Sequence, residues 1–212
     1  DAIASEWQDR LRLDAVVTQP DRPSGRGRKL APNAIKAWAL SRGIEVLQPQ
    51  RIDAVEKQRF KDRGWSLALV MAYGKILPRS LLEIPEIGFF NFHASLLPRL
   101  RGASPIETAI ATMEAETGVC LMKMVAEMDA GPLLARRAMP IGGRATGPEL
   151  RGDLAKLTVA VLRDGLDSLT GAAPMSLEPQ DASQATYCRL IDKRDGWLDF
   201  SLTAREVDAH VR

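Results

Sequence analysis

Short apolar runs alternate with segments of helical character along most of the chain. The runs at 14–18, 44–47, 67–72 and 88–93 have the length and composition of buried strands. Because strands that alternate with helices assemble into largely parallel sheets, this order predicts an α/β fold with a Rossmann-like, doubly wound, mostly parallel sheet. The helices that we expect around these strands lie at 2–11, 33–42, 54–63, 80–83 and 104–113.

The second half of the chain predicts two more strands and a long helix. The strands lie at 119–125 and 133–139, with a short turn between them. Thr146 and Glu149 have the spacing of a capping box. They predict a helix that runs from about 147 to 169.

The segment that follows has a different composition. Residues 171–186 are rich in Ala, Pro, Ser, Asp and Gln without a clear period, which indicates a linker or a strap along the surface. A final helix is expected from Thr203 onward. We therefore predict a main domain over 1–170, a linker over 171–194 and the start of a C-terminal domain over 195–212.

Composition restricts the class of protein. Hydrophobic residues make up 45% of the 212 residues and charged residues 26%, which is ordinary for a globular protein in water. The net charge of +2 means that any contact with nucleic acid must rely on a local patch of positive charge. No apolar run is long enough to cross a bilayer, and no signal peptide is seen. We expect a cytoplasmic protein that does not contact membranes.

The cysteines and histidines do not form a metal-binding pattern. Cys120 and Cys188 are far apart in the sequence, and we interpret them as reduced cytosolic thiols. Cys120 lies in an apolar run and is expected in the core. We predict no metal ion.

Candidate chemistry gathers at the end of the strand 88–93. Asn91 and His93 are two positions apart on an extended segment, so both point to one face of the sheet. Ligands of doubly wound sheets bind beyond the carboxyl ends of the strands. Asp129, in a turn next to glycine, could lie beside this end.

An amide, an imidazole and a carboxylate suit the transfer of an acyl group to an amine. The carboxylate of Asp129 can accept the proton that the amine loses, while Asn91 and a protonated His93 can donate to the oxygen that becomes negative. The alternative is structural, because a single Asn, His or Asp is more often a cap, a packed side chain or a turn residue.

Longer motifs around these residues resemble a known family. Residues 91–98 (NFHASLLP), followed by Arg101-Gly102, resemble a signature of the 10-formyltetrahydrofolate-dependent transformylases, and the segments 116–119 and 128–131 match in order and spacing. The resemblance implies the formyltransferase fold and 10-formyltetrahydrofolate as co-substrate. It also implies that Asn91, His93 and Asp129 are the catalytic residues.

The same resemblance implies two walls of a folate site. One is the loop after the strand 88–93, and the other is the stretch that follows the strand 67–72. The residues of these walls are Ser95, Leu96, Leu97 and Pro98, and Ala72, Tyr73, Gly74, Ile76 and Leu77.

A basic loop over 18–30 (TQPDRPSGRGRKL) resembles that of the family members that formylate methionyl-tRNA. The resemblance implies initiator methionyl-tRNA as a partner. Only Asp21 opposes the positive charges of the loop, so phosphate contacts would give salt-dependent affinity. The alternative is a solvated basic loop. The implied tRNA-binding residues are Arg22, Arg26, Arg28 and Lys29.

The C-terminal segment also resembles the family members that formylate methionyl-tRNA, although the match is weaker. Residues 185–187 and 195–201 resemble the passage that leads into a C-terminal domain in that group, with Phe200 where Trp is usual. The family's first strand would precede Asp1, and we find no counterpart, so we expect these residues to be part of a longer protein that acts as a monomer. Three alternatives remain open: an amino-sugar formyltransferase, a formyltetrahydrofolate hydrolase, and a non-catalytic folate- or RNA-binding remnant.

Overall fold

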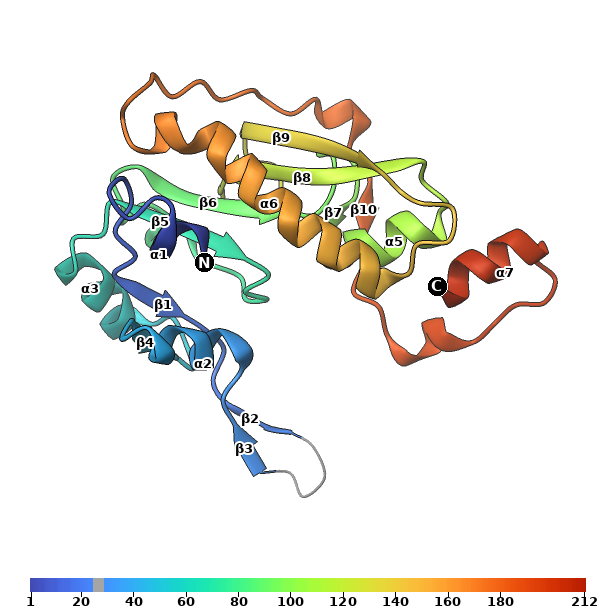
Figure 1. Cartoon of the computed structure of the whole chain (residues 1–212), viewed down its shortest axis with the longest axis horizontal. Helices are drawn as coiled ribbons and strands as arrows, with labels where there is room; N and C mark the ends of the chain where they lie inside the picture. The colour runs from blue at the N-terminus through green and yellow to red at the C-terminus, as the bar shows by residue number, and fades with distance from the viewer. Residues whose placement is uncertain (25–28) are drawn as a thin grey trace. The chain divides into compact units, whose positions relative to one another are not determined.

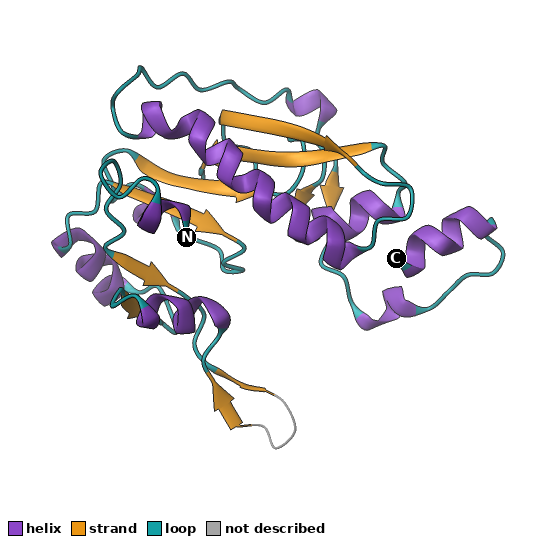
Figure 2. Ribbon diagram, viewed as in Figure 1, coloured by secondary structure: helices purple, strands orange, loops and turns teal. Residues whose placement is uncertain are grey.

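The computed structural model describes residues 1–24 and 29–212 and divides into two compact units (Figure 1). The first unit consists of Asp1–Trp65 and Lys75–Ile84, and the second of Ser66–Gly74 and Pro85–Arg212. Both units combine helices with strands (Figure 2). The α/β class expected from the alternating pattern is confirmed.

The first unit is built around a pair of parallel strands. Val16 of β1 lies opposite Val46 of β4, and the helix α2 packs on both strands. The Asn33 side chain caps α2 by accepting a hydrogen bond from the Lys36 amide at 2.9 Å. The elements of this unit are α1 (Ala2–Ser5), β1 (Ala15–Val17), β2 (Arg22–Ser24), β3 (Lys29–Ala31), α2 (Ala34–Ser41), β4 (Glu45–Leu47), α3 (Ala54–Asp62) and α4 (Arg79–Leu82).

The basic segment contains more regular structure than the sequence predicted. β2 and β3 form an antiparallel pair in which Arg22 lies opposite Ala31. Such pairing satisfies backbone groups that an irregular loop would leave to water. The basic segment is therefore carried on a hairpin.

The second unit contains a four-stranded sheet in the order β5-β6-β8-β9. β5 and β6 are parallel, as expected, whereas the β6–β8 and β8–β9 pairs are antiparallel. A short loop joins β8 to β9, and a short connection between neighbouring strands requires them to run in opposite directions. The elements of this unit are β5 (Leu67–Met71), β6 (Gly88–His93), β7 (Arg101–Gly102), α5 (Pro105–Ala111), β8 (Glu116–Lys123), β9 (Leu133–Pro140), α6 (Gly147–Leu169), η1 (Ala182–Gln184), β10 (Tyr187–Cys188), η2 (Lys193–Gly196) and α7 (Ala204–Val211).

The long helix α6 covers β8 and β9 and forms much of the core of this unit (Figure 1). Its buried residues recur at intervals of three or four positions, with adjacent pairs at 161/162 and 165/166, which places them along one stripe of the helix. Val119 and Leu121 of β8 are also buried. The buried leucines and valine of α6 are Leu150, Leu154, Val161, Leu162, Leu166 and Leu169.

β5 departs from the burial that its apolar sequence predicted. All of its residues are at least partly exposed, and Met71 is 55% exposed. Within the described part of the chain, β5 is an edge strand of its sheet and pairs only with β6. An edge strand lacks the neighbour that would cover its second side.

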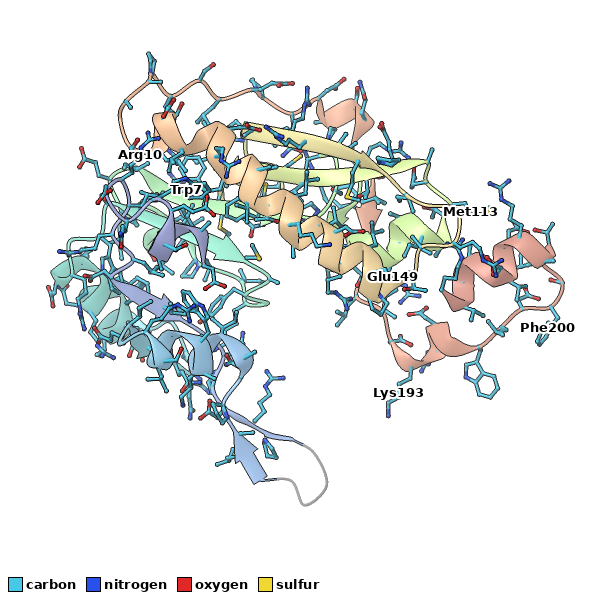
Figure 3. All side chains as sticks on the ribbon, in the orientation of Figure 1. Trp7, Arg10, Met113, Glu149, Lys193 and Phe200 are labelled. Atoms are coloured by element: carbon cyan, nitrogen blue, oxygen red, sulfur yellow. The ribbon has the colours of Figure 1, made fainter. Side chains whose placement is uncertain are left out.

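The segment after α6 runs along the second unit and then joins its sheet structure. β10 pairs in parallel with β7, so Tyr187 lies opposite Arg101. Further on, Trp197 and Phe200 are each 82% exposed, and the Phe200 side chain projects away from the ribbon (Figure 3). The resemblance implied that Phe200, standing where Trp is usual, would preserve an apolar anchor, and its exposure shows that it is not buried as one. The domain boundaries at 170 and 194 remain predictions.

Both cysteines are buried and free, as the sequence indicated. Cys120 is fully enclosed in the core of the second unit, and burial raises the pKa of its thiol to about 11. Burial also raises the pKa of Cys188. None of the helices in the described ranges has the length and apolar character needed to cross a membrane.

The capping box predicted at the start of α6 is present. The Thr146 hydroxyl accepts from the Glu149 amide, and the Glu149 carboxylate accepts from the Thr146 amide at 2.9 Å. We expect Thr146→Ala to lower the free energy of unfolding by about 1 kcal/mol, because an amide at the helix start loses its partner. Thr146→Ser keeps the hydroxyl and is the matched control. Urea unfolding followed by circular dichroism measures the difference, and equal stability of both variants would contradict the assignment.

Candidate active site

His93, at the end of β6, is held between a backbone carbonyl and a carboxylate. The side chain is 5% exposed. Its Nε2 lies 2.8 Å from the Leu100 carbonyl oxygen, and its Nδ1 lies 3.6 Å from Oδ2 of Asp129. The imidazole and the carboxylate predicted from the sequence are therefore neighbours.

The partners of His93 determine which nitrogen carries hydrogen. A carbonyl oxygen can only accept, so Nε2 must donate to Leu100. Nδ1 then faces Asp129, and 3.6 Å is longer than a hydrogen bond. A protonated Nδ1 would attract the carboxylate and could still donate to an oxygen atom placed beside the two groups. The pair can thus hold or release one proton next to a bound ligand.

Asp129 is fixed by the loop that also contains Leu100, the residue whose carbonyl accepts a hydrogen bond from His93. Its Oδ2 accepts a hydrogen bond from the Gly102 amide at 2.8 Å. The Asp129 side chain is 15% exposed. Because one carboxylate oxygen is bound to the backbone, the orientation of the whole group is restricted.

Backbone strain is concentrated around this site. Ala72, Leu100 and Asp129 have φ values of 47°, 56° and 50°, in the left-handed region. Each costs on the order of 1 kcal/mol for a residue other than glycine, although Asp tolerates it better than most. The local sequence alone disfavours these conformations. The surrounding structure therefore holds all three residues: Ala72 at the end of β5, Leu100 as the acceptor of His93, and Asp129 with its carboxylate.

Asn91 lies two positions before His93 on the same face of β6. It is half-buried, and its Cα partners are Val70 of β5 and Met122 of β8. In the described ranges, no hydrogen bond joins its side chain to His93 or Asp129. Its amide N–H groups can therefore donate to a ligand at this strand end.

The loop Ser95–Pro98 contributes unequally to any ligand site. The Ser95 hydroxyl donates to the Arg99 carbonyl at 2.6 Å, and the residue is 1% exposed. Leu97 is 2% exposed and packs with Cys120, Met122 and Leu133. Leu96 and Pro98 are half-buried, and the Leu97-Pro98 peptide bond is cis. Ser95 and Leu97 therefore offer a ligand almost no exposed surface, and the accessible residues of the loop are Leu96 and Pro98.

The second predicted folate wall is divided between the two units. Ala72 and Gly74, at the end of β5, are exposed, and Tyr73 is half-buried. In the first unit, Ile76 is 95% exposed and Leu77 is half-buried. The exposed apolar side chain of Ile76 is unusual and is available to a ligand or a partner.

A cavity of about 180 Å³ lies in the second unit between the loop and the strap after α6. It is lined by Leu97 and Pro98 on one side and by Glu178 and Gln184 on another. Its charged lining residues Arg136 and Glu178 form an ion pair at 3.2 Å. We do not place the reaction here, because His93 and Asp129 are not among the lining residues.

The base of the basic hairpin is held by polar contacts in the first unit. Lys36 Nζ donates to Asp21 Oδ2 at 2.6 Å and to Gln48 Oε1 at 2.7 Å. The Gln48 amide donates to Asp21 Oδ1 and to the Gln19 carbonyl, both at 2.8 Å. These bonds and the Lys36 ion pair lower the pKa of Asp21, with the Gln48 hydrogen bond as the largest cause. We call Asp21, Lys36 and Gln48 the hairpin clamp.

The predicted tRNA-binding residues are placed only in part. Arg22 is exposed in β2, and Lys29 lies in β3. Arg26 and Arg28 lie outside the described residues. Their role remains a prediction from the sequence.

The sequence did not single out three residues that lie around His93 and Asp129. Arg101 is 2% exposed and donates to the side chain of Gln180. The Thr186 hydroxyl accepts from the Leu100 amide at 2.9 Å. Arg101 and Thr186 appeared in motifs without a role, and Gln180 carried no signal beyond its place in an aperiodic polar segment.

The comparisons with known proteins agree on a family. The family described as formyl transferase matches residues 3–166. Two relatives described as methionyl-tRNA formyltransferases come from Stenotrophomonas maltophilia (strain K279a) and Dechloromonas aromatica (strain RCB). The first is 47% identical over 93% of this chain and 64% of its own length, and the second 45% identical over 93% and 63%. The chain spans just under two thirds of the length of these relatives.

Solved structures share the fold at lower identity. An N-formyltransferase from Helicobacter canadensis, in complex with folinic acid and dTDP-3-aminofucose, has a TM-score of 0.75 and 16% identity over 100% of this chain and 74% of its own. A sugar N-formyltransferase from a Shewanella species has a TM-score of 0.68 and 21% identity over 84% and 71% of the two chains. At these identities the likeness concerns the fold alone.

The family match contains the whole candidate site. The residues from Ala72 at the end of β5 to Asp129 all lie within 3–166, whereas Gln180 and Thr186 lie beyond it. The match extends over well more than half of the chain. The chain therefore belongs to the formyl transferase family.

Proposed function

We propose that this protein transfers the formyl group of 10-formyltetrahydrofolate to the amino group of initiator methionyl-tRNA, for the start of translation. The observation that carries the chemistry is the position of the Asp129 carboxylate, 3.6 Å from Nδ1 of His93 and bound to the Gly102 amide. The relatives named for this activity support the choice of substrate. The proposal includes a cytoplasmic protein that acts as a monomer without a metal ion.

Asp129 and His93 would accept a proton from the amine and donate one to the leaving group. The amine nitrogen of the substrate forms a bond to the formyl carbon and loses one proton, which Asp129 accepts directly or through a water molecule. The bond between the formyl carbon and N10 of the folate then breaks. N10 receives one proton from the Asp129–His93 pair, so the pair returns to its starting state.

Asn91 would stabilise the negative oxygen of the tetrahedral intermediate. Its amide lies on the same face of β6 as His93 and donates to no catalytic partner in the described ranges. The protonated Nδ1 of His93 can donate to the same oxygen, because Asp129 does not bind it at hydrogen-bond distance. Two donors at the developing charge would act in a largely enclosed site, where such interactions are strong.

The residues at the ends of β5 and β6 fit a folate co-substrate, which supplies the formyl carbon. Ala72 and Gly74 are exposed, so backbone groups at the end of β5 can approach a planar ring. Of the folate wall residues Ser95, Leu96, Leu97 and Pro98, the half-buried Leu96 and Pro98 offer apolar surface beside it. The proposed walls thus combine backbone polarity with apolar surface, as small-molecule sites usually do.

The basic hairpin would contact the phosphates of the tRNA. Arg22, Arg26, Arg28 and Lys29 concentrate four positive charges in one short segment. Phosphate contacts of this kind give affinity that decreases with salt. An amino-sugar formyltransferase would not need such a segment.

A direct assay tests the proposal. The protein is supplied with 10-formyltetrahydrofolate and, separately, with charged initiator tRNA, with a nucleotide-linked amino sugar, or with no acceptor. We expect formyl-methionyl-tRNA and tetrahydrofolate with charged tRNA as the acceptor, and no formyl transfer to the sugar. Formylation of the sugar, or release of formate without an acceptor at a comparable rate, would reject the proposed substrate.

Asp129→Asn removes the charge but keeps an oxygen for the Gly102 amide. We expect kcat for tRNA formylation to fall by about 10²–10⁴-fold, because the amine loses its proton acceptor, while folate affinity changes little. Steady-state kinetics and equilibrium binding of the folate measure the two effects. Asp153→Asn, on the surface of α6, is the matched control, and full activity of Asp129→Asn would remove Asp129 from the mechanism.

Arg26→Ala tests the basic hairpin. We expect KM for tRNA to rise and the dependence of log affinity on log salt to become shallower by roughly one unit, since one phosphate contact is lost. Filter binding at several salt concentrations gives the slope. Arg205→Ala removes the same charge from an exposed position of α7 and should leave the slope unchanged. An unaltered slope in Arg26→Ala would exclude this contact.

Gln48→Ala tests the hairpin clamp. The variant removes the acceptor of Lys36 and the donor to Asp21, so we expect the hairpin to lose its fixed orientation. KM for tRNA should rise by about 10-fold, in line with the loss of one to two kcal/mol of positioning, without a change in folate affinity. Gln58→Ala, an exposed glutamine of α3, serves as the control. A KM equal to that of the control would show that the clamp does not affect tRNA use.

A further inference from the structure

Gln180, in the strap after α6, joins two loops of the candidate site through all four hydrogen-bonding positions of its amide. Its Oε1 accepts from Nε and Nη2 of Arg101 at 3.1 and 2.8 Å. Its Nε2 donates to the carbonyls of Asp129 and Gly131 at 2.9 and 2.7 Å. A guanidinium can only donate and a carbonyl can only accept, so only one orientation of the amide is possible.

These bonds hold the backbone of Asp129 where its conformation is strained. Asp129 has a φ of 50°, and its carbonyl is one of the two that Gln180 binds. Gly131, two positions further on, is also restricted, because a Cβ there would lie 1.7 Å from the Lys123 carbonyl oxygen. The carboxylate itself is bound by the Gly102 amide. Asp129 is thus held at its carboxylate by one loop and at its carbonyl by the strap.

The Oε1 atom of Gln180 holds the second loop, which contains Arg101 and the backbone N–H of Gly102. Arg101 is 2% exposed, and its guanidinium needs partners because it is removed from water. Gln180 provides an acceptor for two of its N–H groups. Arg101 and Gly102 form β7, so the position of Gln180 relative to Arg101 also sets the position of the Gly102 amide relative to Asp129.

The strap also contacts Leu100, the residue whose carbonyl accepts from His93. Thr186 accepts from the Leu100 amide through its hydroxyl at 2.9 Å, and its carbonyl accepts from the Arg101 amide at 2.9 Å. The strap approaches so closely that a Cβ on Gly102 would lie 2.1 Å from the Cys188 carbonyl oxygen. Leu100, which accepts from His93, is therefore fixed by the same segment that fixes Asp129.

We propose that Gln180 is a positioning residue for the reaction: it sets the separation of Asp129 and His93 without touching the substrate. The inference rests on the proposed function and adds a role for a segment outside the matched family range. Gln180 and Thr186 of the strap then act as a brace for the site. Displacing a catalytic group by about 1 Å can cost up to about 100-fold in rate, so losing the brace should reduce kcat strongly.

The principal test compares Gln180→Met with Gln184→Met in the full chain. Gln184 lies in the same strap and is exposed, and among the residues that the structure describes its side chain donates to Asp181 alone, at 2.9 Å. We expect Gln180→Met to lower kcat for tRNA formylation by at least about 10-fold while both KM values stay within about threefold. Gln184→Met should behave as wild type. An unchanged kcat, or a loss that appears only as a higher KM for either substrate, would overturn the positioning role.

A second readout does not depend on activity. The chain has two histidines, His93 in the site and His210 in the exposed part of α7. In proton NMR at fixed pH, the ring resonances of His93 should move in Gln180→Met, because Asp129 is displaced, while those of His210 should not. A His93 resonance identical to that of the wild type would contradict the inference. A shifted resonance in a protein that fails to formylate tRNA would reject the proposed function and retain the positioning role.

Gln180→Glu covers the case in which Gln180→Met does not fold. The carboxylate keeps an acceptor for Arg101 and loses both donors to the Asp129 and Gly131 carbonyls. A folded Gln180→Glu protein should show the same loss of kcat with unchanged KM values. Wild-type kcat in this variant would show that the bonds to the Asp129 loop are not required.

Discussion

The hydrogen bond between the Gly102 amide and the Asp129 carboxylate is the interaction on which the candidate site depends. It joins the loop after β6 to the loop between β8 and β9. Without it, the carboxylate would be free to rotate toward water, and nothing local would keep it near His93. Because the bond uses a backbone donor, its position follows from the path of the chain at β7 and not from a flexible side chain.

That path is in turn set by a segment far away in the sequence. β7 has only two residues, and its pairing with β10 is what keeps it extended. Gln180 and Thr186 add side-chain contacts to Arg101 and to the Leu100 amide. The site therefore consists of a rigid strand, β6, and two strained loops that a strap holds together. Left-handed residues persist only where the surroundings impose them, and here the surroundings include the strap.

The two units would have different roles in the proposed reaction. The second unit contains His93, Asp129 and the groups that orient them. The first unit contains the basic hairpin, whose base is fixed by Asp21, Lys36 and Gln48. Chemistry and substrate selection thus depend on separate sets of contacts, and each set can be altered while the other stays intact.

The sequence alone determined the features that depend on nearby residues. Alternating apolar runs identified the α/β class, Thr146 and Glu149 identified the start of α6, and the spacing of Asn91 and His93 put both on one face of a strand. Caps and strand faces follow from contacts within a few positions, so a pattern is enough to find them.

Only the tertiary structure decided which distant segments meet. Arg101 and Gln180 are 79 positions apart, and Asp129 and Gln180 are 51 apart. Their contacts require the strap to pack along the second unit, and an aperiodic segment carries no pattern that specifies such packing. The exposure of β5 and of Phe200 was likewise decided by which neighbours pack on them, because burial depends on the partners that surround an apolar residue as well as on the residue itself.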